Sequence, residues 1–210
     1  MANVAARVSK VEERLSLLST MASEWGMGAD SRPLASQGAW TRRQTQAPDR
    51  RDMDSQSVKT TEVGGPERGF DSGKRVKGRK RHLLVDTLGL VLVGVVTAAS
   101  VSDPAGAREV LKRLRGTCKK LRKVWVDGAY RGADWMSWVK DKYRIVLATV
   151  LRTEEPKGFS VLPRRWVVER TLAWLGQSRR LSKDYEELPT TSEPFIYGAM
   201  TRLMLRRLAA

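Results

Sequence analysis

Two acidic residues, Asp127 and Glu169, stand in positions that suit metal-dependent chemistry on a phosphate group. Asp127 ends a short apolar run at residues 123–127 and is followed by a glycine, a pattern typical of a strand end. Glu169 lies within residues 164–174, where apolar side chains recur at helical spacing. Carboxylates presented from a strand end and from a helix can hold a divalent cation beside a phosphodiester. The pair therefore indicates phosphoryl transfer on nucleic acid.

The composition favours a polyanionic partner. The 210-residue chain has 39 Lys and Arg against 23 Asp and Glu, which gives a formal net charge of +16 and a pI near 10.5. Such a chain is drawn to nucleic acid through counterion release, whatever the base sequence. Charge alone does not separate DNA, RNA and anionic lipid. A hydrophobic share of 41% is enough to build a core.

Several classes of site are excluded by the residues that are rare. Cys118 is the only cysteine and His82 the only histidine, so internal disulfides and zinc sites of several Cys and His are ruled out. A bound metal must be held mainly by carboxylates. We interpret His82 as structural rather than catalytic, and Cys118 as an inert, partly buried thiol.

No segment of the sequence predicts a membrane partner. The longest apolar run, residues 88–99, is well short of the roughly 20 residues that a spanning helix needs. The N-terminus also lacks the pattern of a secretory signal. We therefore expect a cytoplasmic protein.

The patterning predicts an N-terminal region, residues 1–52, followed by a folded domain, residues 53–210. Apolar residues at alternating spacings of four and three predict an amphipathic N-terminal helix, either solvent-facing or loosely docked, or a short dimeric coiled coil. These residues are Val4, Val8, Val11, Leu15, Leu18 and Ala22. Residues 26–56 are rich in Ser, Gly, Arg, Gln and Asp, which favours a linker that builds no core.

The folded domain is predicted to alternate strands and helices. The expected elements are a hairpin of residues 81–86 and 90–98 that turns at 87–89, a helix from Asp103 to Gly116, a strand at 123–127, a helix at 132–143, a strand at 144–151, the helix of Glu169, and a last helix that opens at 191–194. With one more strand at residues 53–59, this order predicts an α/β fold of the ribonuclease-H-like type, a mixed five-stranded sheet flanked by helices. In that fold Asp54 and Asp127 would project from neighbouring strands about 5 Å apart. The helix after the fifth strand would bring Glu169 across the top.

Five segments carry motifs that occur together in one family. They are residues 54–60, 69–71, 76–87, 126–130 and 166–170. In type and order they resemble bacterial insertion-sequence transposases of the DDE class, over about residues 53–208. The resemblance implies Asp54, Asp127 and Glu169 as catalytic acids and metal ligands, with two Mg²⁺ or Mn²⁺ ions. It also implies DNA as partner, a homo-oligomer when active, and cut-and-rejoin chemistry on the ends of an element.

Each acid also has a purely structural interpretation. Asp127 could form the turn before Gly128, and Glu169 could pair with Arg165 one helical turn away. Asp52 is the nearest competitor of Asp54. Residues 49–53 carry too many charges for a buried central strand, so we expect the first strand to be short or displaced.

The sequence departs from the family in two places. Residues 1–52 lack the Trp- and Leu-rich helical region that these transposases use to recognise element ends. In and before the helix of Glu169, Arg165 and Glu169 keep the spacing of the family. Leu162 replaces a tyrosine of the family motif, and Gly176 stands where the family has a basic residue. Two alternatives therefore stay open: an inactive remnant that only binds DNA, and a nuclease of the same fold.

Basic residues flank the predicted site on both sides. We predict that they contact the phosphate backbone of DNA. The first group precedes the hairpin and the second accompanies the acid helix: Lys74, Arg75, Lys77, Arg79, Lys80 and Arg81, then Arg165, Arg179 and Arg180. Most tryptophans have the spacing of a helical core, and stacking of Trp166 or Trp174 on a base is a minor alternative.

Overall fold

The computed structural model describes residues 50–62, 64–114, 121–150 and 166–209. By contacts the chain divides between Thr45 and Gln46, and every described residue belongs to the second unit. The predicted N-terminal helix, Cys118, Leu162 and Arg165 lie outside the described residues. Within the described part, no helix is long and apolar enough to cross a membrane.

The described elements follow the predicted alternation of strands and helices. In chain order they are β1 (Arg50–Lys59), β2 (Gly69–Asp71), β3 (Val76–Val85), β4 (Val91–Ala98), α3 (Asp103–Leu114), β5 (Lys123–Val126), the 3₁₀ helix η2 (Gly128–Tyr130), α4 (Ala133–Tyr143), β6 (Val146–Thr149), α5 (Trp166–Gly176), the 3₁₀ helix η3 (Arg179–Leu181) and α6 (Pro189–Ala209). The short strand β2 is an addition to the predicted elements.

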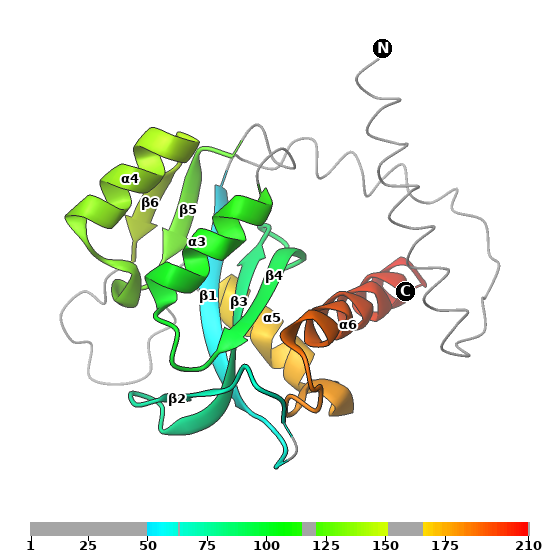
Figure 1. Ribbon diagram of the computed structural model, residues 1–210. Coiled ribbons are helices and arrows are strands. Elements are labelled where there is room, and N and C mark those ends of the chain that lie inside the picture. The colour runs from blue at the N-terminus through cyan, green and yellow to red at the C-terminus, as the bar shows by residue number, and fades with distance from the viewer. Residues whose placement is uncertain (1–49, 63, 115–120, 151–165, 210) are drawn as a thin grey trace, which may run out of the picture. The chain divides into compact units, whose positions relative to one another are not determined.

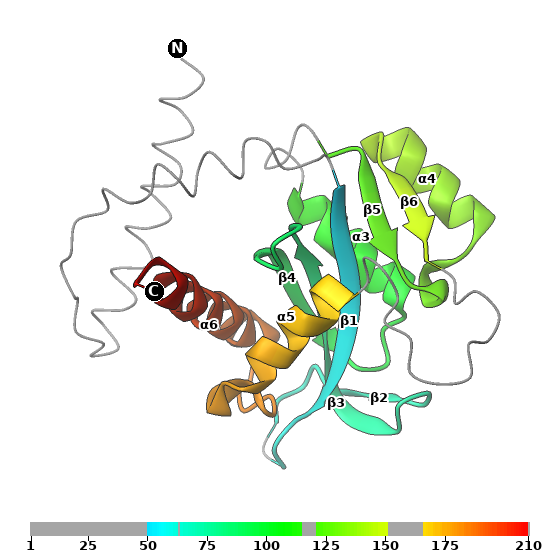
Figure 2. The same cartoon turned by 180° about the vertical axis from the view of Figure 1, so that it is seen from behind.

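The strands form a mixed sheet with β1 at its centre. The sheet has six strands in the order β2-β3-β1-β5-β6, and β4 also pairs with β3. β1 runs antiparallel to β3 and parallel to β5, and β5 runs parallel to β6. Helices α3 and α4 cover one face, seen in Figure 1, and α5 crosses β1 on the other face, seen in Figure 2. This arrangement confirms the predicted α/β fold of the ribonuclease-H-like type.

The main core fills the space between the sheet and the helices α3 and α4. It contains Met53 of β1, Val124 and Val126 of β5, and the apolar stripe Val110, Leu111 and Leu114 that the spacing of α3 predicts. The free edge of β4 is covered by α6. The N–H of Gly94 donates to the Tyr197 hydroxyl at 2.9 Å, and that of Val96 to the Glu193 carboxylate at 3.1 Å. These bonds satisfy edge groups that would otherwise be open to another strand.

The prediction that the first strand is short or displaced is wrong. β1 is ten residues long and begins at Arg50, inside the segment predicted as linker. Its charged start is accommodated because the pairing with β3 and β5 satisfies the backbone on both sides. Asp52 is buried, and this burial raises the pKa of its carboxyl to about 7, against the lowering effect of Arg51.

The start of the last helix also differs from the prediction. α6 begins at Pro189, upstream of residues 191–194, and therefore contains Pro194 within its early turns. Pro189 suits a first helical position, because its missing N–H is not needed there.

Candidate active site

Asp54 and Asp127 lie at matching positions on adjacent parallel strands. Asp52 of β1 is paired with Trp125 of β5. Asp54 follows Asp52 by two residues, and Asp127 follows Trp125 by the same interval. Neighbouring strands are about 4.8 Å apart. Continued by these two residues, the register would bring Asp54 beside Asp127, at the point where β5 ends.

Both acids belong to the face of the sheet that α5 covers. Met53 and Val126 precede them and are buried in the core beneath α3 and α4. Successive side chains of a strand point to opposite faces, and the backbone of Asp127 is still extended, with φ −79° and ψ 171°. α5 packs against β1 and β3. The helix that carries Glu169 thus lies over the face to which Asp54 and Asp127 belong.

Backbone N–H groups that follow each acid orient its carboxylate. The N–H of Ser55 donates to Oδ1 of Asp54 at 2.7 Å. Asp127 caps η2, and its Oδ1 accepts from the N–H of Ala129. Asp127 therefore forms the turn before Gly128 and also stands as an acid at the end of a strand, so the two interpretations are compatible.

Tyr130 is buried in the core, where the negative charges of Asp54 and Asp127 act on its hydroxyl. Burial, followed by the negative charges of Asp54, Asp103 and Asp127, raises the pKa of this phenol well above its ordinary value. The hydroxyl makes no hydrogen bond of standard geometry within the described residues. Ser55 is nevertheless near enough to lower the phenol pKa. Sequence reasoning missed Tyr130, although it ends the motif at residues 126–130.

A polar cluster on the opposite face of β1 fixes the strand next to Asp54. The hydroxyl of Ser55 donates to Asp103 at 2.7 Å, and that of Ser57 donates to Asp71 at 2.5 Å. The ammonium of Lys80 lies 3.3 Å from Asp103 and 3.5 Å from Asp71. Ser57, then Lys74 and Lys80, hold the pKa of Asp71 at about 2. The pairing of β3 with β1 and with β2, together with the packing of α3, brings these residues together, so no local pattern in the sequence signals the cluster.

Glu169 is presented from the exposed side of α5. The helix is held by its buried side, which consists of Val167, Val168, Thr171, Leu172 and Leu175. No group of three or more His, Cys, Asp or Glu in the described ranges is placed to hold a metal ion. The convergence of Asp54, Asp127 and Glu169 therefore stays a prediction.

The prediction of phosphate contact is wrong for Arg79 and Arg81, because both side chains are buried. Arg79 donates to the carboxylate of Asp184 at 3.2 Å and to the carbonyl of Glu186 at 2.8 Å. Arg81 donates to the carbonyls of Leu181 and Lys183 at 2.7 and 3.2 Å. Both arginines therefore tie β3 to the segment that follows α5.

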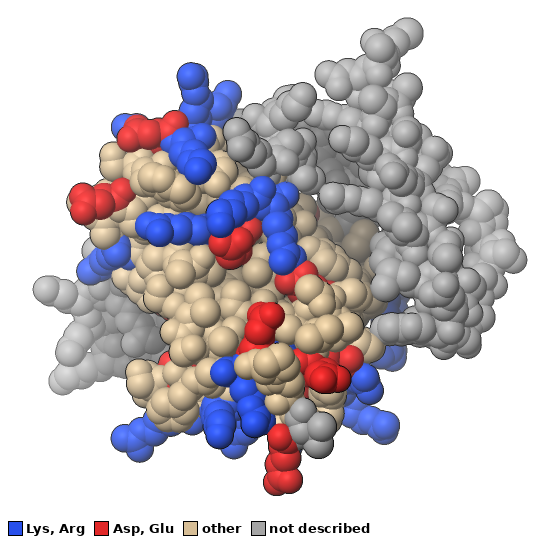
Figure 3. Space-filling view, viewed as in Figure 1, with Lys and Arg blue, Asp and Glu red and all other residues tan. Residues whose placement is uncertain are grey.

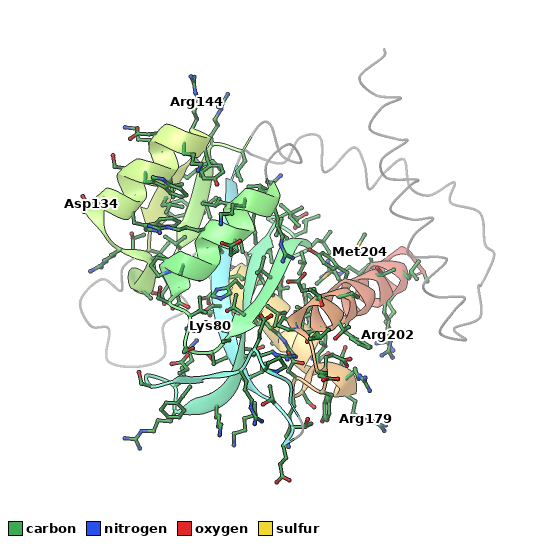
Figure 4. All side chains as sticks on the ribbon, in the orientation of Figure 1. Lys80, Asp134, Arg144, Arg179, Arg202 and Met204 are labelled. Carbon is green, nitrogen blue, oxygen red and sulfur yellow. The ribbon has the colours of Figure 1, made fainter. Side chains whose placement is uncertain are left out.

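Lys80 is also buried, so it does not fit the predicted phosphate contact either. Figure 4 shows it inside the fold near the start of α3, whereas Arg179 points outward. Lys74, Arg75 and Lys77 are exposed, and so are Arg179 and Arg180. Basic side chains gather near β2 and over α3 and α4 in Figure 3. Phosphate contact stays a prediction for the exposed residues.

Two tryptophans of α5 stack on an arginine. The Arg170 guanidinium carbon lies 4.2 Å from the Trp166 ring centroid and 4.5 Å from that of Trp174. Trp166 is 42% exposed, so its position differs from the core position that its spacing suggested.

Comparison with known proteins identifies the family. Residues 45–204 match the family model described as Transposase DDE domain. The chain is also 30% identical, over 148 residues, to a Burkholderia cepacia protein whose name describes a putative transposase for insertion sequence element IS402. That match covers 67% of each of the two chains. The chain therefore belongs to the DDE-domain transposases.

The acid pair suits the divalent ions that this family generally uses. Magnesium keeps several waters and is typically held by one or two carboxylates together with phosphates of the substrate. Asp54 and Asp127 supply two such carboxylates, each oriented by a backbone N–H. The donor chemistry therefore fits, without a complete cage of protein ligands.

Proposed function

We propose that this chain catalyses metal-dependent cleavage and strand transfer of DNA in the transposition of an insertion sequence. The observation that supports the proposal is the register of β1 and β5, in which Asp52 pairs with Trp125. Continued by two residues, this register would bring Asp54 beside Asp127, on the face of the sheet against which α5 packs. Membership of the DDE transposases supports the same assignment.

Asp54, Asp127 and Glu169 are the proposed ligands of Mg²⁺ or Mn²⁺, two ions in the complete site. When bound, such ions activate the attacking oxygen and stabilise the leaving 3′-oxygen in an in-line displacement at phosphorus. The chain itself orients the two aspartates through the N–H groups of Ser55 and Ala129. Glu169 completes the set from α5.

The exposed basic residues after β2 are the proposed contacts to the DNA backbone. Lys74 supports this assignment, because its ammonium donates to the carbonyl of Ser55 at 3.3 Å, next to Asp54 in the chain. Arg75 lies in the same loop and Lys77 follows at the start of β3, and these three residues are called the basic loop. Arg179 and Arg180 follow α5, and Arg165 precedes it. We place the active protein in the cytoplasm with its DNA, as a homo-oligomer.

A second candidate function is DNA binding without catalysis. Gly176 favours this function, because the glycine leaves the exposed side of α5 without the basic residue that the family has at this position. A nuclease of the same fold would cut DNA without joining it.

A strand-transfer assay separates these functions. The full chain is incubated with linear DNA that carries the ends of its element and with a supercoiled target plasmid, in Mg²⁺ or Mn²⁺ and in EDTA. The proposal expects metal-dependent cleavage and joined products. Cleavage without joining would indicate a nuclease. A chain that binds DNA but neither cuts it nor binds Mn²⁺ would be the inactive remnant.

A further inference from the structure

The helix that carries Glu169 is fastened to the turn between β3 and β4. The two residues after Glu169 both donate hydrogen bonds to carbonyls of this turn, residues 86–90. The hydroxyl of Thr171 lies 2.6 Å from the carbonyl oxygen of Gly89, and Nη2 of Arg170 lies 3.1 Å from that of Leu88. Both contacts lie within one helical turn of the acid.

The turn itself has a defined shape. The buried carboxylate of Asp86 accepts from the N–H groups of Leu88 and Leu90 at 2.8 and 2.9 Å. Backbone bonds from Gly89 to Asp86 and from Asp86 to Leu90 close the turn at 3.0 and 2.9 Å. Hydrogen bonds within residues 86–90 therefore hold the carbonyls of Leu88 and Gly89 in a defined orientation.

Close packing leaves α5 little freedom against this turn. Gly89 has φ +82°, and a Cβ at this position would lie 2.7 Å from the Thr171 hydroxyl oxygen. The same Cβ would lie 3.1 Å from the Trp174 ring and 3.3 Å from the Arg170 guanidinium. The carbonyl oxygen of Val167 lies 3.0 Å from the same hydroxyl, so the two carbonyls share its one proton and the hydroxyl joins the helix to the turn. The stacking of Arg170 between Trp166 and Trp174 holds the guanidinium in place.

We propose that the turn at residues 86–90 sets the position of Glu169 over Asp54 and Asp127, with Thr171 and Arg170 as positioning residues. The inference rests on the proposed function, since it concerns how that site is assembled. A carboxylate on a helix follows the rigid-body position of the helix. Loss of the two bonds to the turn should therefore displace the acid while the sheet and the two aspartates stay in place.

The test compares Thr171→Val, which removes the hydroxyl at nearly constant shape, with Thr171→Ser, which restores it. Arg170→Met removes the second bond to the turn at a half-buried position and keeps an unbranched side chain of similar length. Thr201→Val is the matched control, because the Thr201 hydroxyl donates to the carbonyl of Tyr197 at 2.9 Å, a bond that lies entirely within α6. Each protein is checked for folding by thermal melting.

The position of α5 is measured by pulsed electron paramagnetic resonance on DNA-free protein. Spin labels are placed at two exposed positions, Ala173→Cys on α5 and Lys140→Cys on α4, with Cys118→Ser. Mn²⁺ affinity is measured on the same variants without the labels. We expect Thr171→Val and Arg170→Met to shift or broaden the distance distribution. Loss of a group that orients a metal ligand lowers metal affinity about 10- to 100-fold, and we expect a loss in this range for Thr171→Val.

Thr171→Ser and Thr201→Val should keep the native distribution and Mn²⁺ affinity. An unchanged distribution in both Thr171→Val and Arg170→Met would overturn the inference. If Thr171→Val does not fold, the distance distribution of Arg170→Met decides whether the inference holds. A native protein that neither binds Mn²⁺ nor cuts DNA would sink the proposed function instead, and the distances would still decide whether the turn positions the helix.

Discussion

Arg79 of β3 and Asp184 form an ion pair 3.2 Å long in which the two side chains are 0% and 1% exposed. The hydroxyl oxygen of Ser192 in α6 lies 2.8 and 2.9 Å from the two carboxylate oxygens of Asp184, which share its one proton. Removal of one partner leaves a buried charge unpaired, which costs about 3–5 kcal/mol. We therefore expect Asp184→Asn to lower the free energy of unfolding by an amount of this order in urea titrations.

The ion pair of Arg180 and Glu186 gives a control in which the arginine is open to solvent. It is 2.7 Å long, and the side chains of Arg180 and Glu186 are 57% and 16% exposed. Exposed pairs contribute roughly 0–1 kcal/mol, so Arg180→Met should change the unfolding free energy little. Equal effects of Asp184→Asn and Arg180→Met would contradict the structural assignment of Arg79.

Gly106 of α3 lies directly against the imidazole of His82. A Cβ at this position would lie 2.1 Å from a ring carbon of His82. Overpacking of a filled core costs about 1–3 kcal/mol, so Gly106→Ala should destabilise the protein although alanine favours helices. Gly198→Ala in α6 is the control, because a Cβ there would meet no neighbouring atom within 4 Å. There the change should stabilise by about 0.5–1 kcal/mol, and thermal melting of both variants measures the difference in sign.

His82 makes stability depend on pH. Burial, against the raising effect of Asp103 and with smaller lowering effects of Lys80 and Lys74, lowers the imidazole pKa from 6.5 to about 4. Between these pH values the unfolded chain binds a proton that the folded chain does not. Stability from this group is therefore present above pH 6.5 and falls toward pH 4, by about 1.4 kcal/mol per pH unit.

His82→Gln removes this titration. The difference in unfolding free energy between the native protein and His82→Gln should be constant above about pH 7 and should shrink or reverse as the pH falls below the ordinary imidazole value. Urea titrations over a series of pH values measure it. Asp52 has a raised pKa, so its contribution to the unfolding free energy changes with pH in the opposite direction. It is present in both proteins, and the difference between them therefore reports on His82. A difference that does not vary with pH would show that the imidazole is not kept neutral by burial.

The exposed basic loop after β2 should dominate the salt dependence of DNA binding. Each phosphate contact contributes about 0.9 to the slope of log K against log salt. Replacement of Lys74, Arg75 and Lys77 by Gln should therefore lower the slope by up to about 3 on any duplex. The matched control replaces Lys140, Lys142 and Arg144, at the end of α4 away from Asp127. Equal slopes for the loop variant and the native protein would contradict the assignment.

Local patterns predicted the elements that depend on local physics. The hairpin of β3 and β4, the apolar stripe of α3 and the strand ending at Asp127 follow from strand alternation, helical spacing and turn residues. The family motifs predict Asp54, Asp127 and Glu169 as the catalytic acids, and the register of β1 and β5 is compatible with the proposed neighbourhood of Asp54 and Asp127. The catalytic role of these acids stays a prediction.

Tertiary partners explain what the sequence could not show. The charged start of β1 resembles a linker, because its burial depends on β3 and β5. Arg79 and Arg81 resemble a DNA-binding run, yet they lie on a central strand and donate to carbonyls that come from the segment after α5. Neither the polar cluster at Ser55 nor the bonds from Thr171 to the turn leaves a mark in local composition.

The most direct test of the account is DNA cleavage by Asp127→Asn. The change removes a metal-binding charge at nearly constant shape, whereas DNA affinity comes from Lys and Arg elsewhere. We predict that Asp127→Asn and Asp54→Asn abolish Mn²⁺-dependent cleavage and keep DNA affinity within about twofold of native, since no phosphate contact is lost. Asp134→Asn, at an exposed acid of α4, should cleave as the native protein does. Native cleavage by Asp127→Asn would contradict the account.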